Sequence, residues 1–183
     1  MAARLTLITV PTDNDRRAPR FPGRDRLDLT FESLPETVRR CLSEADHLIH
    51  APEIAIGPNA TVRVPAEVAE ALSNLDYGNW ANRTMTEIAG ADPAGFEVWR
   101  MDMAAAPHGG EAISSARDRV GGWLAGLEER SGAIVALCPA TIVRIALTAA
   151  LEAPLSMIWR LDPMPWSACE LTRHGDRWSL RLS

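Results

Sequence analysis

The sequence contains no lysine, so all nineteen of its cationic side chains are arginines. This absence excludes any reaction that forms a Schiff base between a lysine amine and a carbonyl substrate. The net charge of the 183 residues is −5, so the chain also lacks the basic charge that is typical of a dedicated nucleic-acid binder. We therefore expect no nucleic-acid partner.

Long hydrophobic runs and metal-binding spacings are missing as well. No apolar run reaches the ~18 residues of a membrane-spanning helix, and the first residues lead into a strand pattern without the regions of a signal peptide. The cysteines Cys41, Cys138 and Cys169 are far apart, and the four histidines lack the spacing of metal ligands. These absences predict a reduced cytoplasmic protein with no membrane segment, no metal and no cofactor.

Short apolar strand patterns alternate with amphipathic helix patterns along the whole chain. Strand or extended patterns cover residues 5–10, 47–51, 58–64, 157–161, 167–173 and 177–182. Helix patterns cover 65–74 and 113–129, and N-terminal capping residues start shorter helices at Ser33, Thr84 and Asp92. The alternation predicts one domain over residues 1–183, an α/β three-layer sandwich with a mostly parallel sheet and helices on both faces.

Cys138 lies in the stretch that indicates where a site would form. Residues 133–137 are an apolar run typical of a buried strand, and a helix pattern runs on from Pro139. In open α/β sheets, ligands and catalytic groups gather at such a turn, at the carboxyl end of a strand and facing a helix N-terminus. We therefore expect the functional site at this turn.

The order of the motifs resembles the histidine phosphatase superfamily, which has the phosphoglycerate mutase-like fold. The motifs are residues 75–80 (LDYGNW), residues 107–111 (PHGGE) before a long helix, and residues 139–144 (PATIVR) after an apolar strand. The resemblance implies that fold. It also implies a site in which one histidine accepts a phosphoryl group, a second histidine and arginines bind it, and a carboxylate acts as the acid.

The sequence departs from the family pattern at most of those positions. Val10 and Cys138 stand where the resemblance places the two histidines, and Ala55 stands where it places an arginine. Glu111 matches the carboxylate, and Arg17 matches an arginine of the pocket. Because valine cannot accept a phosphoryl group and much of the positive charge is lost, we predict that phosphohistidine chemistry is absent.

One interpretation is a repurposed enzyme that acts on a non-phosphorylated small-molecule metabolite in the inherited cleft. Glu111 would be the general acid or base, with Cys138 and Arg17 beside it. Further candidate ligand contacts are the strand-end His50, His108 in a glycine-rich loop, Trp80, and the replaced positions Val10 and Ala55.

A second interpretation is a non-catalytic relative that binds a metabolite or a protein partner, in which Glu111 only caps the long helix. The apolar strand edge expected at residues 157–159 could also support a homodimer.

A third interpretation is a cysteine-dependent phosphatase, because Cys138 and Arg144 have the cysteine, five residues, arginine spacing. A helix N-terminus would lower the pKa of the thiol. Against this interpretation, Pro139 has no amide to offer a phosphate, and Ile142 and Val143 replace the usual small residues. A small apolar replacement for a histidine is the simpler explanation of Cys138.

Overall fold

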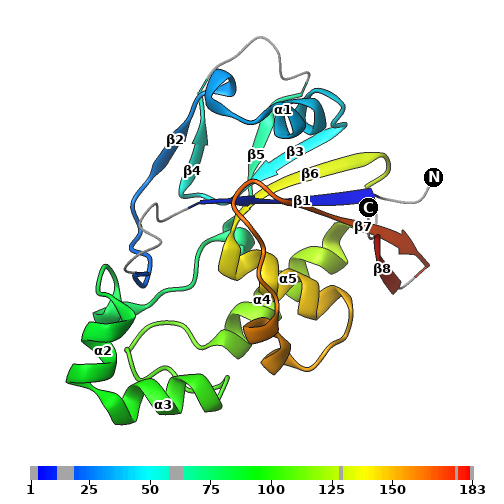
Figure 1. The fold of residues 1–183 in the computed structure, drawn as a ribbon. Helices are drawn as coiled ribbons and strands as arrows, with labels where there is room; N and C mark the ends of the chain where they lie inside the picture. The colour runs from blue at the N-terminus through cyan, green and yellow to red at the C-terminus, as the bar shows by residue number, and fades with distance from the viewer. Residues whose placement is uncertain (1–3, 12–18, 58–63, 128–129, 176, 182–183) are drawn as a thin grey trace.

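The computed structural model describes residues 4–11, 19–57, 64–127, 130–175 and 177–181. At its centre is a six-stranded sheet with the strand order β5-β3-β6-β1-β7-β8 (Figure 1). The strands are β1 (Arg4–Val10), β3 (His47–His50), β5 (Ala66–Val68), β6 (Ala133–Pro139), β7 (Ala168–His174) and β8 (Arg177–Arg181). The first four of these pair in parallel, whereas β7 and β8 form an antiparallel hairpin at one edge. The strands β2 (Leu27–Leu29) and β4 (Ile54–Ile56) form a separate parallel pair.

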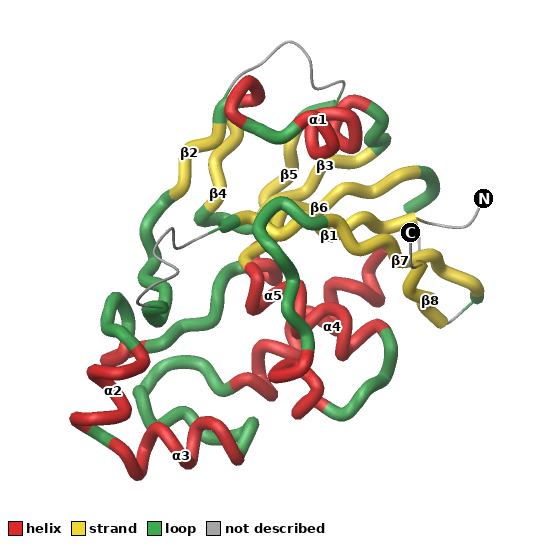
Figure 2. The backbone as a smooth tube through the Cα atoms, viewed as in Figure 1, coloured by secondary structure: helices red, strands yellow, loops and turns green. Residues whose placement is uncertain are grey.

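Helices cover both faces of this sheet. The α-helices are α1 (Glu36–Ser43), α2 (Met85–Ala91), α3 (Pro93–Met101), α4 (Ile113–Gly126) and α5 (Ala140–Ala150). The 3-10 helices are η1 (Phe31–Ser33), η2 (Glu70–Leu72), η3 (Gly78–Trp80) and η5 (Leu155–Arg160). In Figure 2, α1 lies on one side of the sheet and α4 and α5 lie on the other, while α2 and α3 extend further out, connected by loops. The predicted α/β sandwich with a mostly parallel sheet is confirmed.

The central strands β1 and β6 are buried on both faces, which explains their continuous apolar runs. Leu5, Leu7 and Ile8 of β1 are fully buried, as is most of β6. The register sets Thr9 opposite Cys138 and Val10 opposite Pro139. Val10 and Cys138, the two positions at which the resemblance places histidines, are therefore diagonal neighbours at the carboxyl ends of adjacent parallel strands.

The structure corrects two predicted elements and leaves a third undescribed. Residues 65–74 are strand β5 followed by η2 rather than one helix, because β5 pairs with β3 and tertiary pairing overrides a weak helix propensity. Residues 157–161 are not a strand: Leu155–Arg160 form η5, which begins directly after Pro154. The extended segment predicted at 58–64 lies outside the described residues except for Val64.

Helix α1 begins later than its predicted cap. Pro35 precedes its first turn without a capping side chain, and the Ser33 hydroxyl instead donates to the carbonyl of Thr30 at 2.7 Å. The capping residues predicted for the next two helices are confirmed: Thr84 caps α2 and Asp92 caps α3.

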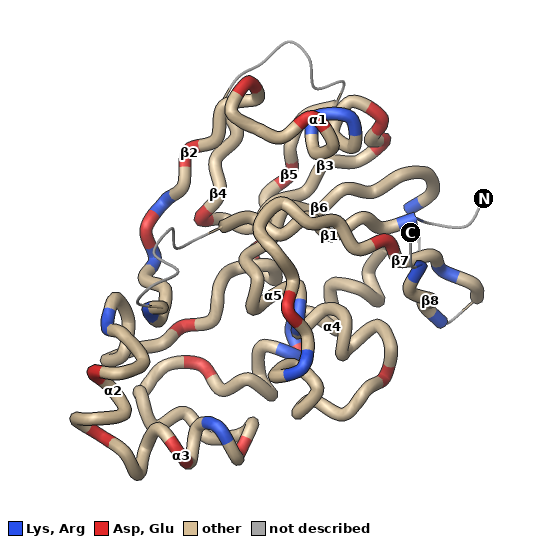
Figure 3. The backbone as a smooth tube through the Cα atoms, viewed as in Figure 1, with Lys and Arg blue, Asp and Glu red and all other residues tan. Residues whose placement is uncertain are grey.

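No helix in the described ranges has the length and apolarity that crossing a membrane would need. Acidic and basic residues are interspersed along the chain (Figure 3).

Candidate functional site

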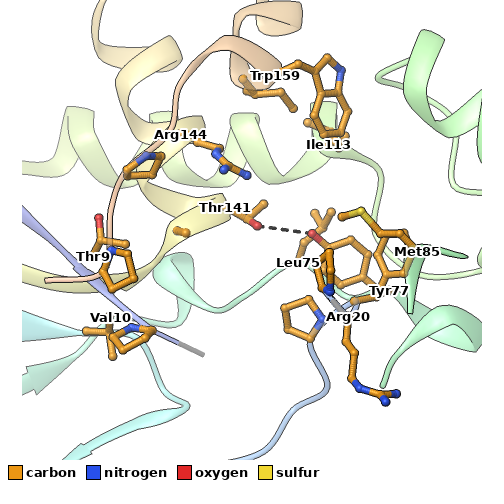
Figure 4. Close-up of a pocket in the computed structure, with 18 of the residues that line it drawn as sticks. Thr9, Val10, Arg20, Leu75, Tyr77, Met85, Ile113, Thr141, Arg144 and Trp159 are labelled. Carbon is orange, nitrogen blue, oxygen red and sulfur yellow. Dashed lines mark hydrogen bonds between the residues drawn. The ribbon is translucent and has the colours of Figure 1, made fainter. Parts of the chain in front are cut away.

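A pocket of about 310 Å³ lies at the carboxyl end of β1 and the first turn of α5 (Figure 4). The segment 19–22, the residues just before η3, the starts of α2 and α4, Trp99 of α3, and the segment that follows α5 complete its walls. The lining residues are Thr9, Val10, Pro11, Pro19, Arg20, Phe21, Pro22, Leu75, Tyr77, Met85, Trp99, Ile113, Ala140, Thr141, Arg144, Ile158, Trp159, Pro163 and Pro165. This pocket therefore lies at the strand-to-helix turn at which the sequence predicted a site.

Most of the lining is apolar or aromatic. Among the described residues of the lining, there is no carboxylate, imidazole or thiol. The groups that can form hydrogen bonds or carry charge are two threonines, one tyrosine, two tryptophan indoles and two arginines. This composition suits recognition of an apolar body by shape, with only a few polar contacts to orient it.

Tyr77 and Thr141 form the polar centre of the pocket. The Tyr77 phenol oxygen lies 3.4 Å from the Thr141 hydroxyl, and Figure 4 shows the two side chains facing each other. Burial raises the pKa of Tyr77 above its ordinary value. The phenol is therefore neutral at neutral pH, so it can donate a hydrogen bond to a ligand but is a poor general base.

A cluster of aromatic rings supports this wall of the pocket. The ring of Phe21 lies 5.1 Å from that of Tyr77, 5.2 Å from Trp80 and 5.3 Å from Trp99, measured between centroids. Trp99 in turn meets Trp159 edge to face at 4.9 Å. Because Phe21, Tyr77, Trp99 and Trp159 line the pocket, this packing fixes the shape of its walls.

The two arginines of the lining are placed differently. Arg144, on α5, donates from Nε to the carbonyl of Leu161 at 2.8 Å, and its Nη2 lies 3.5 Å from a carboxylate oxygen of Asp162. Figure 4 shows its guanidinium pointing into the space between the lining residues. Arg20 instead donates to the carbonyl of Asn82 at 2.9 Å, and its guanidinium points away from that space.

The profile of the histidine phosphatase superfamily (branch 1) matches residues 51–183, which is most of the chain. The chain belongs to the histidine phosphatase superfamily. No curated protein matches it.

Solved structures with the same fold are similar over nearly the whole chain. A protein described as mycobacterial hydrolase 2 superimposes with a TM-score of 0.77 at 19% identity, over 99% of this chain and 90% of its own. A mycobacterial glucosyl-3-phosphoglycerate phosphatase gives 0.73 at 20% identity, over 98% and 97%. A putative alpha-ribazole-5'-P phosphatase from Escherichia coli gives 0.79 at 15% identity, over 100% and 96%. At these identities the similarity establishes the fold.

Cys138 does not have the environment of a nucleophile. Its side chain is fully buried, it is not part of the pocket lining, and its sulfur lies 3.7 Å from the carbonyl oxygen of Ala136. Burial raises the pKa of the thiol far above its ordinary value, which is the opposite of the shift expected at a helix N-terminus. The thiolate that a cysteine-dependent phosphatase needs is therefore strongly disfavoured.

Glu111 does not face the pocket, so the structure does not support its expected role as acid or base there. Both of its carboxylate oxygens accept hydrogen bonds from Arg119, at 2.6 Å from Nε and 2.8 Å from Nη2. Arg119 also donates to the carbonyls of Ala71 and Ser73. The pair lines a separate, open depression together with Arg24 and other polar residues. Glu111 therefore joins the start of α4 to the segment around η2.

The two candidate histidines also lie outside the pocket lining. His108, a candidate ligand contact whose glycine-rich loop would ordinarily be exposed to solvent, is instead 1% exposed, and its Nδ1 accepts from the amide of Gly110 at 3.0 Å. Burial lowers the pKa of His108, more than the nearby Asp76 raises it. His50 is buried at the end of β3, with Nδ1 2.9 Å from the carbonyl oxygen of Ala51. Neither imidazole therefore contributes to the described lining of the pocket.

Of the remaining candidates, Val10 lines the pocket. Ala55 lies on β4 opposite Asp28 and is absent from the lining, so that contact is not supported. Trp80 is buried behind Phe21 and shapes the pocket wall without lining it. Arg17 lies outside the described residues.

Sequence reasoning missed the pocket roles of Tyr77, Thr141 and Trp159. Arg144 was considered only as the partner of a reactive Cys138. Thr141 and Arg144 are three residues apart in the helix that starts at the predicted site, so their shared helix face was a usable signal. Nothing in the local pattern indicates that Trp159 would reach the same space, because its position depends on how η5 packs against α5.

Proposed function

We propose that this chain is a non-catalytic member of its superfamily that binds a mainly apolar small molecule in the pocket beside Val10. The observation that carries the proposal is the pocket lining, in which the described residues offer apolar surface and hydroxyls but no nucleophile, acid or base. This favours the binding interpretation over a repurposed enzyme, because the carboxylate on which the enzyme interpretation depended is held by Arg119.

Two features argue against phosphohistidine chemistry. Val10 stands where the family resemblance places the histidine that accepts the phosphoryl group, and Cys138, opposite Thr9 on the neighbouring strand, is buried with a raised pKa that favours the thiol. Among the described lining residues, only Arg144 points its guanidinium into the pocket. A phosphoryl group with its three equatorial oxygens needs several cationic donors. The solved relatives named as phosphatases therefore share the fold with this chain, and we do not extend their activity to it.

The pocket volume of about 310 Å³ is at the lower end of the range for ligand sites. It suits a compact ligand, such as one with a fused ring system, between the proline-rich walls. The exposed side of the pocket includes Met85 and Trp159, whose side chains are partly accessible. These two side chains mark the side from which we expect a ligand to enter.

The test uses 2-naphthamide as a neutral apolar probe, in a ligand-observed NMR titration up to millimolar concentration. We expect binding to the wild-type protein. Ala140→Phe should abolish it, because a phenyl ring at this lining position fills the pocket. Ala94→Phe is the matched control, since Ala94 is an exposed residue in the first turn of another helix.

A parallel assay measures phosphate release from p-nitrophenyl phosphate, with an active superfamily phosphatase as the positive control. We expect no release above the buffer blank. Turnover by the wild-type protein would overturn the non-catalytic assignment. Equal binding of 2-naphthamide to the Ala140→Phe variant, or no binding to the wild type, would overturn the pocket assignment.

A further inference from the structure

Arg144 has hydrogen-bonding capacity that the protein does not use. Within the described part of the chain, its Nε is the donor of a well-formed hydrogen bond, to Leu161, and its Nη2 approaches Asp162 only at 3.5 Å, the limit for such a bond. Its Nη1 has no partner among the described residues. The side chain is 30% exposed and lines the pocket, so these N–H groups are accessible to a ligand.

The charge of Arg144 acts in an apolar environment. A guanidinium is always protonated, and no described residue of the lining carries a negative charge to neutralise it. Apolar walls keep water away and strengthen electrostatic attraction at short range. The pocket therefore favours a ligand that brings its own negative charge to this wall.

The geometry of a guanidinium also limits the kind of anion. Its parallel N–H groups match the two oxygens of a carboxylate, in a bidentate arrangement that fixes orientation as well as charge. One guanidinium balances one negative charge, which suits a carboxylate better than a phosphate dianion.

On the basis of the function proposed above, we propose that the ligand is a monocarboxylic acid with a compact apolar or aromatic body, and that Arg144 binds its carboxylate. The body then lies against Tyr77, Met85 and Trp159, across the pocket from Arg144 (Figure 4). The Tyr77–Thr141 hydroxyl pair lies between these two regions and can donate a hydrogen bond to the same ligand.

Within the protein, the carboxylate of Asp162 competes with the ligand's carboxylate for the guanidinium of Arg144. Its side chain is 85% exposed and its carboxylate lies at the limit of hydrogen-bond distance from Nη2 of Arg144. Such a long, exposed ion pair contributes little to stability. A ligand carboxylate that bonds both Nη groups replaces this weak contact, so removing the charge of Asp162 should favour ligand binding.

The experiment compares 2-naphthoate with 2-naphthamide, which have the same ring system and nearly the same size but differ in charge. We expect the wild-type protein to bind the acid at least about tenfold more tightly, the lower end of what a charge-assisted hydrogen bond contributes. Arg144→Gln should remove this preference and leave binding of the amide. Arg160→Gln is the matched control, because it removes an exposed arginine of the adjacent η5 and should keep the preference.

Asp162→Asn provides a test that does not depend on how well Arg144→Gln folds. Because Asp162 is exposed, the substitution should leave the fold intact and tighten binding of 2-naphthoate a few-fold, with no change for 2-naphthamide. Equal affinities of the acid and the amide for the wild-type protein would overturn the role of Arg144 and leave the proposed apolar pocket standing. Failure of 2-naphthamide to bind the wild-type protein would overturn the pocket itself.

Discussion

Both carboxylate oxygens of Glu111 accept hydrogen bonds from Arg119. The Glu111 side chain is 22% exposed and the Arg119 side chain is 25% exposed. A bidentate pair in this half-buried setting holds its geometry better than a surface ion pair. Arg119 extends the contact to the carbonyls of Ala71 and Ser73, so that one guanidinium joins α4 to η2. The carboxylate that the family resemblance suggested for chemistry is thus paired with Arg119 in this structure.

Glu111→Gln should therefore lower the free energy of unfolding by about 1–3 kcal/mol, because it breaks a charge-assisted bidentate contact. Urea unfolding followed by tryptophan fluorescence measures this difference. Glu97→Gln is the matched control. It removes an exposed pair with Arg100, for which we expect a loss of no more than about 0.5 kcal/mol. Unchanged stability together with weaker binding of 2-naphthamide would instead place Glu111 in the ligand site.

At the scale of single elements, α2 depends on a reciprocal cap at its first turn. The Thr84 hydroxyl accepts from the amide of Glu87 at 3.1 Å, and the Glu87 carboxylate accepts from the amide of Thr84 at 2.7 Å. These contacts hold the pKa of Glu87 below its ordinary value, with the Thr84 amide as the main cause. The cap positions α2, from which Met85 reaches the pocket.

The capping contact should make stability depend on pH in the acid range. A carboxylate with a lowered pKa in the folded state stabilises that state above its unfolded pKa of about 4.3, and this contribution is lost as pH falls through the folded pKa. Glu87→Ala should therefore lower the melting temperature most near neutral pH and progressively less below about pH 4. Thermal unfolding of both proteins across this range tests the trend. A difference that grows as the pH falls would contradict it.

On the scale of the whole molecule, the aromatic cluster joins the segment 19–22 to the region of α3. Phe21 is 1% exposed and contacts Tyr77, Trp80 and Trp99, which lie far from it in the sequence. The same cluster forms one wall of the pocket. Packing between distant segments and the shape of the site are therefore coupled.

Phe21→Ala should lower the free energy of unfolding by about 3–5 kcal/mol, since it leaves a cavity at the centre of the cluster. It should also weaken binding of 2-naphthamide. Phe21→Leu, which keeps most of the volume, should cost less and retain binding, as measured by urea unfolding and the NMR titration. A loss below about 1 kcal/mol for Phe21→Ala would show that the cluster does not connect the two regions.

The sequence by itself determined the layered fold and the turn beside which the pocket lies. The apolar runs of β1 and β6 can be buried only as central parallel strands, and the caps at Thr84 and Asp92 are local signals readable within a few residues. Val10, at which the family resemblance places a histidine, could also be assigned to the end of the first strand from this local pattern.

Only the tertiary structure decided which side chains share the pocket. Glu111 and His108 lie in a motif that suggests chemistry, yet Arg119 and the aromatic cluster hold them away from the lining. Arg144 and Trp159 meet there because η5 packs back against α5. Such contacts depend on the docking of segments distant in the sequence, and local hydrophobic periodicity carries no information about that docking.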